Sequence, residues 1–268
     1  MLLTTCLSAL TAAPLVTPAP TVPAASLPAP APIVEAERVK FEEVEFATED
    51  KLKIHARFYA PRKKGRAPAA LLVHDAGSDA ASMDSAAENL QRKGFAVLSI
   101  DLRGHGGSTS EELDWSKTGD ETAQRQLWAY ALRDLEAATA YLRDLDNVHS
   151  SNLSLVGMGA GGVLAARHAT KDPNARAVAL ITPKPEIYGY NMMPDVVALG
   201  GLPVQMLVTS EERADATRIA SAAAKASDGF EYVDVQVIKP KSASDVFSDK
   251  RVNTELAKFL REEAMDKR

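Results

Sequence analysis

An eleven-residue segment near the middle of the chain restricts the folds open to it. Residues 152–162 read Asn-Leu-Ser-Leu-Val-Gly-Met-Gly-Ala-Gly-Gly. The apolar run 153–156 predicts a buried strand, the glycines that follow permit a sharp turn, and 161–170 predicts a helix. A strand that passes through a tight turn into a helix is the opening of a parallel βαβ unit. The segment therefore favours an α/β fold.

The chain on either side continues this alternation. Apolar strands without polar interruptions predict a mainly parallel sheet covered by helices on both faces, and residues 44–48 and 53–61 predict an antiparallel hairpin that leads into it. The predicted strands are 69–75, 95–102, 153–156, 177–182, 204–209 and 233–239, and the predicted helices are 83–93, 121–145, 161–170, 214–226 and 251–263. Residues 35–268 are expected to form one domain.

The first 34 residues have a different composition. They contain seven of the fifteen prolines and no charged residue before Glu35, so they predict a signal-like or disordered tail. Residues 1–10 resemble the apolar part of a secretory signal, and Leu-Thr-Thr-Cys at 3–6 resembles a bacterial lipobox with Cys6 as its lipid-bearing residue. We expect an exported, periplasmic or membrane-tethered protein. The alternative is a cytoplasmic protein with a disordered tail.

Charge and cysteine content exclude several classes of function. The formal net charge of −5 argues against nucleic acid or an anionic membrane as a partner, and the basic run 62–66 is short and lies in a predicted turn. Cys6 is the only cysteine, and the five histidines are scattered. We therefore expect no disulfide, metal or cofactor in the domain, and no apolar run of about 18 residues after the tail predicts a membrane span.

Three loops at the ends of predicted strands carry recognisable motifs. The first reads His-Asp-Ala-Gly at 74–77, the second Asp-Leu-Arg-Gly-His-Gly-Gly-Ser at 101–108, and the third is the glycine-rich turn. In this order they resemble the α/β-hydrolase superfamily, and most closely its lidless bacterial members of the dienelactone-hydrolase and serine-aminopeptidase kind. The resemblance extends from about residue 44 to the C-terminus. It implies an α/β-hydrolase fold with a site at the carboxyl ends of the strands.

The resemblance also shows where this chain departs from a serine hydrolase. The nucleophile position is Gly159, which has no side chain, and the histidine position in the last loop is occupied by Ser242. No histidine follows His168, and the acid position falls on Glu212 or Arg213. A catalytic triad needs a nucleophile and a base, so these departures predict that the triad is lost.

Other parts of the implied site are retained. The backbone N–H groups of Ala76 and Ala160 fall where the family forms its oxyanion hole. Asp75 replaces the usual glycine, and we expect its side chain to turn away and cap the next helix or bond a loop amide; the alternative is that it points inward. Gly77 and Trp115 complete the expected binding residues, while His74 and His105 match structural positions.

Three functions follow from these residues. The leading hypothesis is a non-catalytic homologue that binds a small molecule, peptide or protein in the former active-site cleft. The second is a weak or unorthodox esterase or peptidase with a non-standard nucleophile. Ser78, Ser108 and Ser110 lie on nearby loops, but none has a histidine placed by motif to activate it. The third is a dinucleotide-binding protein, because Gly157, Gly159 and Gly162 spell G-x-G-x-x-G, although the strand 177–182 is followed by prolines instead of the ribose-binding acid.

Overall fold

The computed structural model describes residues 41–227, 232–239 and 243–266. The tail 1–34 with Cys6, and Ser242 in the last loop, lie outside these residues. The main sheet has eight strands in the order β1-β2-β4-β3-β5-β6-β9-β10. They are β1 (Glu42–Ala47), β2 (Lys53–Tyr59), β3 (Ala67–Val73), β4 (Ala96–Ile100), β5 (Val148–Met158), β6 (Ala175–Ile181), β9 (Val204–Val208) and β10 (Val233–Val237).

The pairing of these strands confirms the predicted class. β1 pairs antiparallel with β2, and β2 pairs antiparallel with β4. All other neighbours, from β4 to β10, run parallel. Strands β3, β4 and β9 are buried along their whole length, as strands covered on both faces must be.

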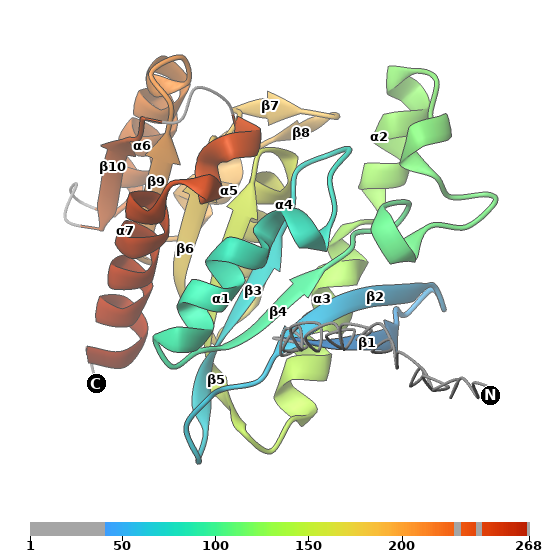
Figure 1. The fold of residues 1–268 in the computed structure, drawn as a ribbon. Helices are drawn as coiled ribbons and strands as arrows, with labels where there is room; N and C mark the ends of the chain where they lie inside the picture. The colour runs from blue at the N-terminus through green and yellow to red at the C-terminus, as the bar shows by residue number, and fades with distance from the viewer. Residues whose placement is uncertain (1–40, 228–231, 240–242, 267–268) are drawn as a thin grey trace, which may run out of the picture. The chain divides into compact units, whose positions relative to one another are not determined.

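Helices cover both faces of the sheet (Figure 1). One apolar core lies under α1 and α7, and the other lies under α3, α4 and α6. The helices are α1 (Asp84–Arg92), α2 (Glu121–Ala129), α3 (Leu132–Asp144), α4 (Ala160–Lys171), α5 (Met193–Ala198), α6 (Arg213–Ala226) and α7 (Lys250–Arg261). Short 3-10 segments occur at Ala80–Met83, Gly106–Ser108, Trp115–Lys117 and Ala243–Ser248, and the π-helical turn Glu262–Asp266 follows α7.

The predicted single helix 121–145 is wrong, because it is broken into α2 and α3 around Tyr130. Successive i→i+3 hydrogen bonds tighten the chain here, from the N–H of Ala131 to the carbonyl of Trp128 and from Arg133 to Tyr130. Tyr130 is 53% exposed and therefore does not belong to the core face. Asp134 is turned inward at the first turn of α3.

A buried ion cluster explains why Asp134 turns inward. Its Oδ2 accepts the backbone N–H of Arg103 at 2.9 Å, and its Oδ1 accepts Nε at 2.9 Å and Nη2 at 2.7 Å. The Arg103 guanidinium also donates to both carboxylate oxygens of Asp50. Asp134 is fully buried and Arg103 is 4% exposed, so the pair holds the loop after β4 onto α3.

The connection between β6 and β9 contains more structure than expected. It forms a small ribbon of β7 (Glu186–Ile187) and β8 (Tyr190–Asn191), and then α5. Its aromatic and methionine side chains are packed instead of exposed: Met192 is fully buried, and the Tyr190 hydroxyl donates to the carbonyl of Trp128.

Candidate functional site

Two backbone amides converge at the carboxyl ends of β3 and β5. The N–H of Ala76, in the loop after β3, and the N–H of Ala160, at the first residue of α4, both donate to Oδ1 of Asp75 at 2.8 Å. The two groups predicted as oxyanion donors therefore do point at one place. The expectation that Asp75 turns away is wrong, because its carboxylate occupies that place. The positive end of the α4 dipole and two otherwise unpaired N–H groups favour an anion there.

The same carboxyl group fills the space of a side chain at residue 159. Gly159 has φ +52°, a conformation that a residue with a Cβ rarely adopts. A Cβ placed on Gly159 would lie 2.2 Å from both Cγ and Oδ1 of Asp75. Asp75 and a serine at 159 therefore cannot both keep these positions. The substitution at 159 and the one at 75 are spatially complementary.

Burial raises the pKa of the Asp75 carboxyl above its ordinary value of 3.8. The hydrogen bonds from Ala160 and Ala76 act in the opposite direction, as does the nearby Lys184 ammonium. Oδ2 of Asp75 accepts no hydrogen bond from the described part of the chain. The Asp75 carboxyl is thus held by Oδ1 alone, at the position where the N–H groups of Ala76 and Ala160 converge.

This raised pKa predicts a pH-dependent stability. Because ionised Asp75 is less favourable in the folded protein than in the unfolded chain, its contribution is fully present below pH 3.8 and is lost as pH rises through the higher folded pKa. An asparagine side chain at this position would keep an acceptor oxygen and cannot ionise. We expect Asp75→Asn to match the wild type at about pH 3 and to exceed its stability at about pH 7, in urea unfolding at both pH values. If the difference in unfolding free energy between Asp75→Asn and the wild type were the same at both pH values, or smaller at pH 7, the prediction would be wrong.

Neither histidine beside the site is available as a base. Nδ1 of His74 donates to the carbonyl of Asp75 and its Nε2 accepts the N–H of Leu102. His105 Nε2 accepts the N–H of Gly77, and its Nδ1 donates to the carbonyl of Arg103. Burial lowers the pKa of His74 to about 3 and also lowers the pKa of His105, so both rings are neutral. They order the loops, as the resemblance implied.

The three candidate serines have no activating histidine among the described residues. Ser108 is buried, and its Oγ donates to the carbonyl of Asp101 and accepts the N–H of His55. The Ser110 hydroxyl accepts the N–H of Leu113 at the surface. The N–H of Ser78 closes a turn with the carbonyl of Asp75. Ser108 is therefore a structural residue, and the other two lack a base.

Of the two residues on which the expected acid position falls, Glu212 carries a carboxylate. Oε2 of Glu212 accepts the N–H and the hydroxyl of Thr209, at 3.0 and 2.6 Å, and Oε1 lies 3.7 Å from Nζ of Lys184. Arg213 is exposed and begins α6. Glu212 thus holds the turn after β9.

Aromatic side chains pack beside Asp75. The ring of Trp115 stacks on His105 with centroids 5.0 Å apart and meets Tyr188 edge-on at 5.2 Å. Tyr188 in turn stacks on Trp128 at 5.8 Å. Burial, and then the charge of Asp75, raise the pKa of the Tyr188 hydroxyl. Trp115 was predicted from the sequence. Tyr188 and Lys184 were not, because only the β7–β8 ribbon brings them here.

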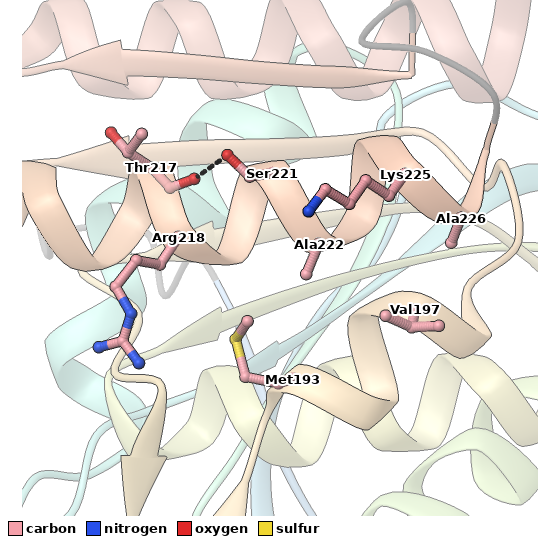
Figure 2. A pocket seen from close by; sticks show the side chains of 8 residues that line it. All are labelled: Met193, Val197, Thr217, Arg218, Ser221, Ala222, Lys225 and Ala226. Atoms are coloured by element: carbon pink, nitrogen blue, oxygen red, sulfur yellow. Dashed lines mark hydrogen bonds between the residues drawn. The ribbon is translucent and has the colours of Figure 1, made fainter.

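A separate groove lies between α5 and α6 (Figure 2). Its volume is about 570 Å³, and Met193, Val197 and Ala222 give it an apolar floor, with Arg218 and Lys225 at its rim. Across the described residues, no cluster of three histidine, cysteine, aspartate or glutamate side chains could hold a metal ion. Within the same residues no helix is both long and apolar enough to span a bilayer.

A family model matches most of the described domain, and two curated fungal proteins match about half of the chain. A family model described as serine aminopeptidase, S33, matches residues 66–239. The acyltransferase drtE of Aspergillus calidoustus is 34% identical over 152 residues, which are 54% of this chain and 44% of the relative. The thiohydrolase aneE of Aspergillus aculeatus is 29% identical over 169 residues, 60% and 48% of the two chains. The chain thus spans about half the length of these curated relatives.

Solved structures show the same fold at low identity. An esterase of Pyrococcus furiosus superposes with a TM-score of 0.65 at 17% identity, over 84% of this chain and 91% of that one. The α/β hydrolase GrgF of a Penicillium species gives 0.65 at 16% identity, over 84% and 99%. Bacterial origin and export stay predictions.

Proposed function

The chain belongs to the serine aminopeptidase S33 family of α/β-hydrolase-fold proteins, and from that premise we propose that it is a non-catalytic member that binds a ligand at its strand ends. The observation that carries the proposal is the position of Asp75. A side-chain carboxylate accepts both oxyanion-hole N–H groups and fills the space of the missing nucleophile. A substrate carbonyl oxygen cannot enter an oxyanion hole whose two N–H groups already donate to a side-chain oxygen.

The surrounding groups support the same conclusion. Acyl transfer needs a nucleophile and a base that removes its proton. Position 159 is glycine, and both ring nitrogens of His74 and His105 are engaged with the backbone. A negative charge at Asp75 would also oppose the negative oxygen of a tetrahedral intermediate.

The dinucleotide alternative is weakened by the same contact. A pyrophosphate would need the N-terminus of α4, and the N–H of Ala160 there already donates to Asp75. The carboxylate would repel the phosphates at this position. Trp115 and Tyr188 are only partly buried, so they offer another kind of ligand an aromatic surface beside Asp75.

The test of inactivity is turnover of p-nitrophenyl butyrate by the purified protein, with the Pyrococcus esterase as the active control. We expect no rate above buffer, in the wild type or in Asp75→Gly/Gly159→Ser, because no base is present to activate the new serine. A fluorophosphonate probe is expected to leave no adduct by mass spectrometry. Turnover that disappears in Ser78→Ala or Ser110→Ala would instead establish an unorthodox serine hydrolase.

The test of binding uses the position of the two tryptophans. Both lie in the aromatic group beside Asp75, so a dye bound there would lie against Trp115. We expect the emission of directly excited 1-anilinonaphthalene-8-sulfonate to rise on binding, and Trp115→Ala to weaken that binding severalfold. Val197→Ala, in the groove between α5 and α6, is the matched control. Loss of binding in the control alone would place the dye in that groove and contradict the proposal.

A further inference from the structure

A cationic pocket lies at the other edge of the sheet, where the parallel strands begin. It is formed by the loop between β2 and β3 and by the C-terminal ends of α1 and α7, which lie at the same lower edge of the molecule in Figure 1. Its volume is about 460 Å³. No acidic side chain is among its lining residues, which include six basic ones: Lys63, Lys64, Arg66, Arg92, Lys93 and Arg261.

Most of these charges have no counter-ion within the described residues. Arg92 lies 3.6 Å from Glu88, one helical turn earlier. Nε of Arg66 donates to the backbone carbonyl of Asp146, and this carbonyl group carries no net charge. The remaining four basic side chains take part in no ion pair with a described residue. The pocket therefore keeps a strong positive field in a chain whose net charge is −5.

The loop that contributes half of these residues is fixed in place. The buried side chain of Gln91 donates from Nε2 to the carbonyl of Ala60 at 2.9 Å, and its Oε1 accepts Nε of Arg62 at 3.3 Å. Pro61 and Pro68 restrict the backbone at the two ends of the loop. The loop is thus bound to α1 before any ligand arrives.

Helix electrostatics explain only part of the cluster. Basic residues at the C-termini of α1 and α7 complement the helix dipoles, which accounts for Arg92, Lys93 and Arg261. The dipoles give no reason for Lys63 and Lys64 in the loop. Like charges brought together from three segments repel one another unless an anion lies between them.

We propose that this pocket binds a multivalent phosphate, either as a free anion or as the headgroup of an anionic lipid. Lysine and arginine are the side chains that recognise phosphate oxygens, and several phosphate groups are needed to balance this many charges. The volume falls in the range of small-molecule sites. This site is independent of the function proposed for the opposite edge.

The experiment is calorimetric titration of the full chain with sodium tripolyphosphate, at about 50 mM and then at about 200 mM salt. We expect binding that weakens with salt and falls at least about tenfold in Lys64→Gln/Lys93→Gln. The control, Lys171→Gln/Lys225→Gln, removes the same charge at exposed positions on α4 and α6 and is expected to bind within about twofold of the wild type. Both double variants change exposed side chains, so thermal unfolding checks that they fold.

Sedimentation with vesicles separates the two sources of phosphate. Phosphatidylcholine vesicles that contain phosphatidylinositol bisphosphate are compared with phosphatidylcholine alone. If the protein sediments with the phosphatidylinositol bisphosphate vesicles and tripolyphosphate releases it, the pocket binds a lipid headgroup. If the protein binds tripolyphosphate in the calorimeter but does not sediment with these vesicles, the pocket binds a free anion. Equal affinities in the pocket and control variants, or no binding of either probe at low salt, would overturn the proposal.

Discussion

Replacing Gly159 by alanine is expected to lower the free energy of unfolding by about 2–6 kcal/mol. A Cβ at φ +52° costs about 1–3 kcal/mol in backbone strain. The same Cβ would lie 2.2 Å from the Asp75 carboxyl, and such a collision costs about 1–3 kcal/mol more unless the carboxylate leaves its two N–H donors. Urea unfolding of Gly159→Ala beside the wild type measures the sum.

A double-mutant cycle isolates the contact with Asp75. In an Asp75→Gly background the collision is absent, so Gly159→Ala is expected to cost only the strain of about 1–3 kcal/mol. The interaction free energy between the two positions is then also about 1–3 kcal/mol. Additive effects would mean that Asp75 does not occupy the space of the nucleophile, which would contradict the proposed inactivity.

Replacing Asp134 by alanine is expected to destabilise the protein by about 3–5 kcal/mol. The change leaves the Arg103 guanidinium, which is 4% exposed, with Asp50 as its remaining acid partner and frees a buried backbone N–H. Losing one carboxylate of a buried ion cluster costs this much because the Arg103 guanidinium gives up its two hydrogen bonds to Asp134 in a medium of low polarity and is left with the partly exposed Asp50 as its counter-ion. The measurement is again the free energy of unfolding in urea.

An exposed ion pair in the neighbouring helix provides the control. Glu121 and Arg125 pair across one turn of α2 at 2.7 Å, with side chains 68% and 56% exposed. Glu121→Ala is expected to change stability by less than about 1 kcal/mol. Equal effects of the two substitutions would mean that the Asp134 cluster does not hold the loop after β4.

Much of the fold was accessible from the sequence because it depends on local patterns. Continuous apolar runs such as 69–75 and 204–209 predicted strands buried on both faces, and β3 and β9 are such strands. The helix boundary at Tyr130 was not accessible. It follows from the contact of Asp134 with Arg103, 31 residues earlier, which no helical periodicity records.

In the candidate site, too, some features were accessible from the sequence and others were not. The two N–H donors were predicted from the loops that carry them, and both point at one position. The orientation of Asp75 was predicted wrongly, because the sequence does not show that the space beside Gly159 is empty until β3 and β5 pair. The sequence did contain one signal for this orientation. The nucleophile position holds the small residue Gly159, while the usual glycine of the first loop is replaced by the larger Asp75.

The sequence by itself determined the α/β class, the glycine at position 159 and the absence of a histidine after His168. These depend on periodicity and on which residue types are present. Only the tertiary structure decided that Asp75 fills the anion site, that Tyr188 and Lys184 lie beside it, and that six basic residues from three segments share one pocket. Such contacts join residues far apart in the chain, and they exist only once the sheet has fixed which loops and helix ends are neighbours.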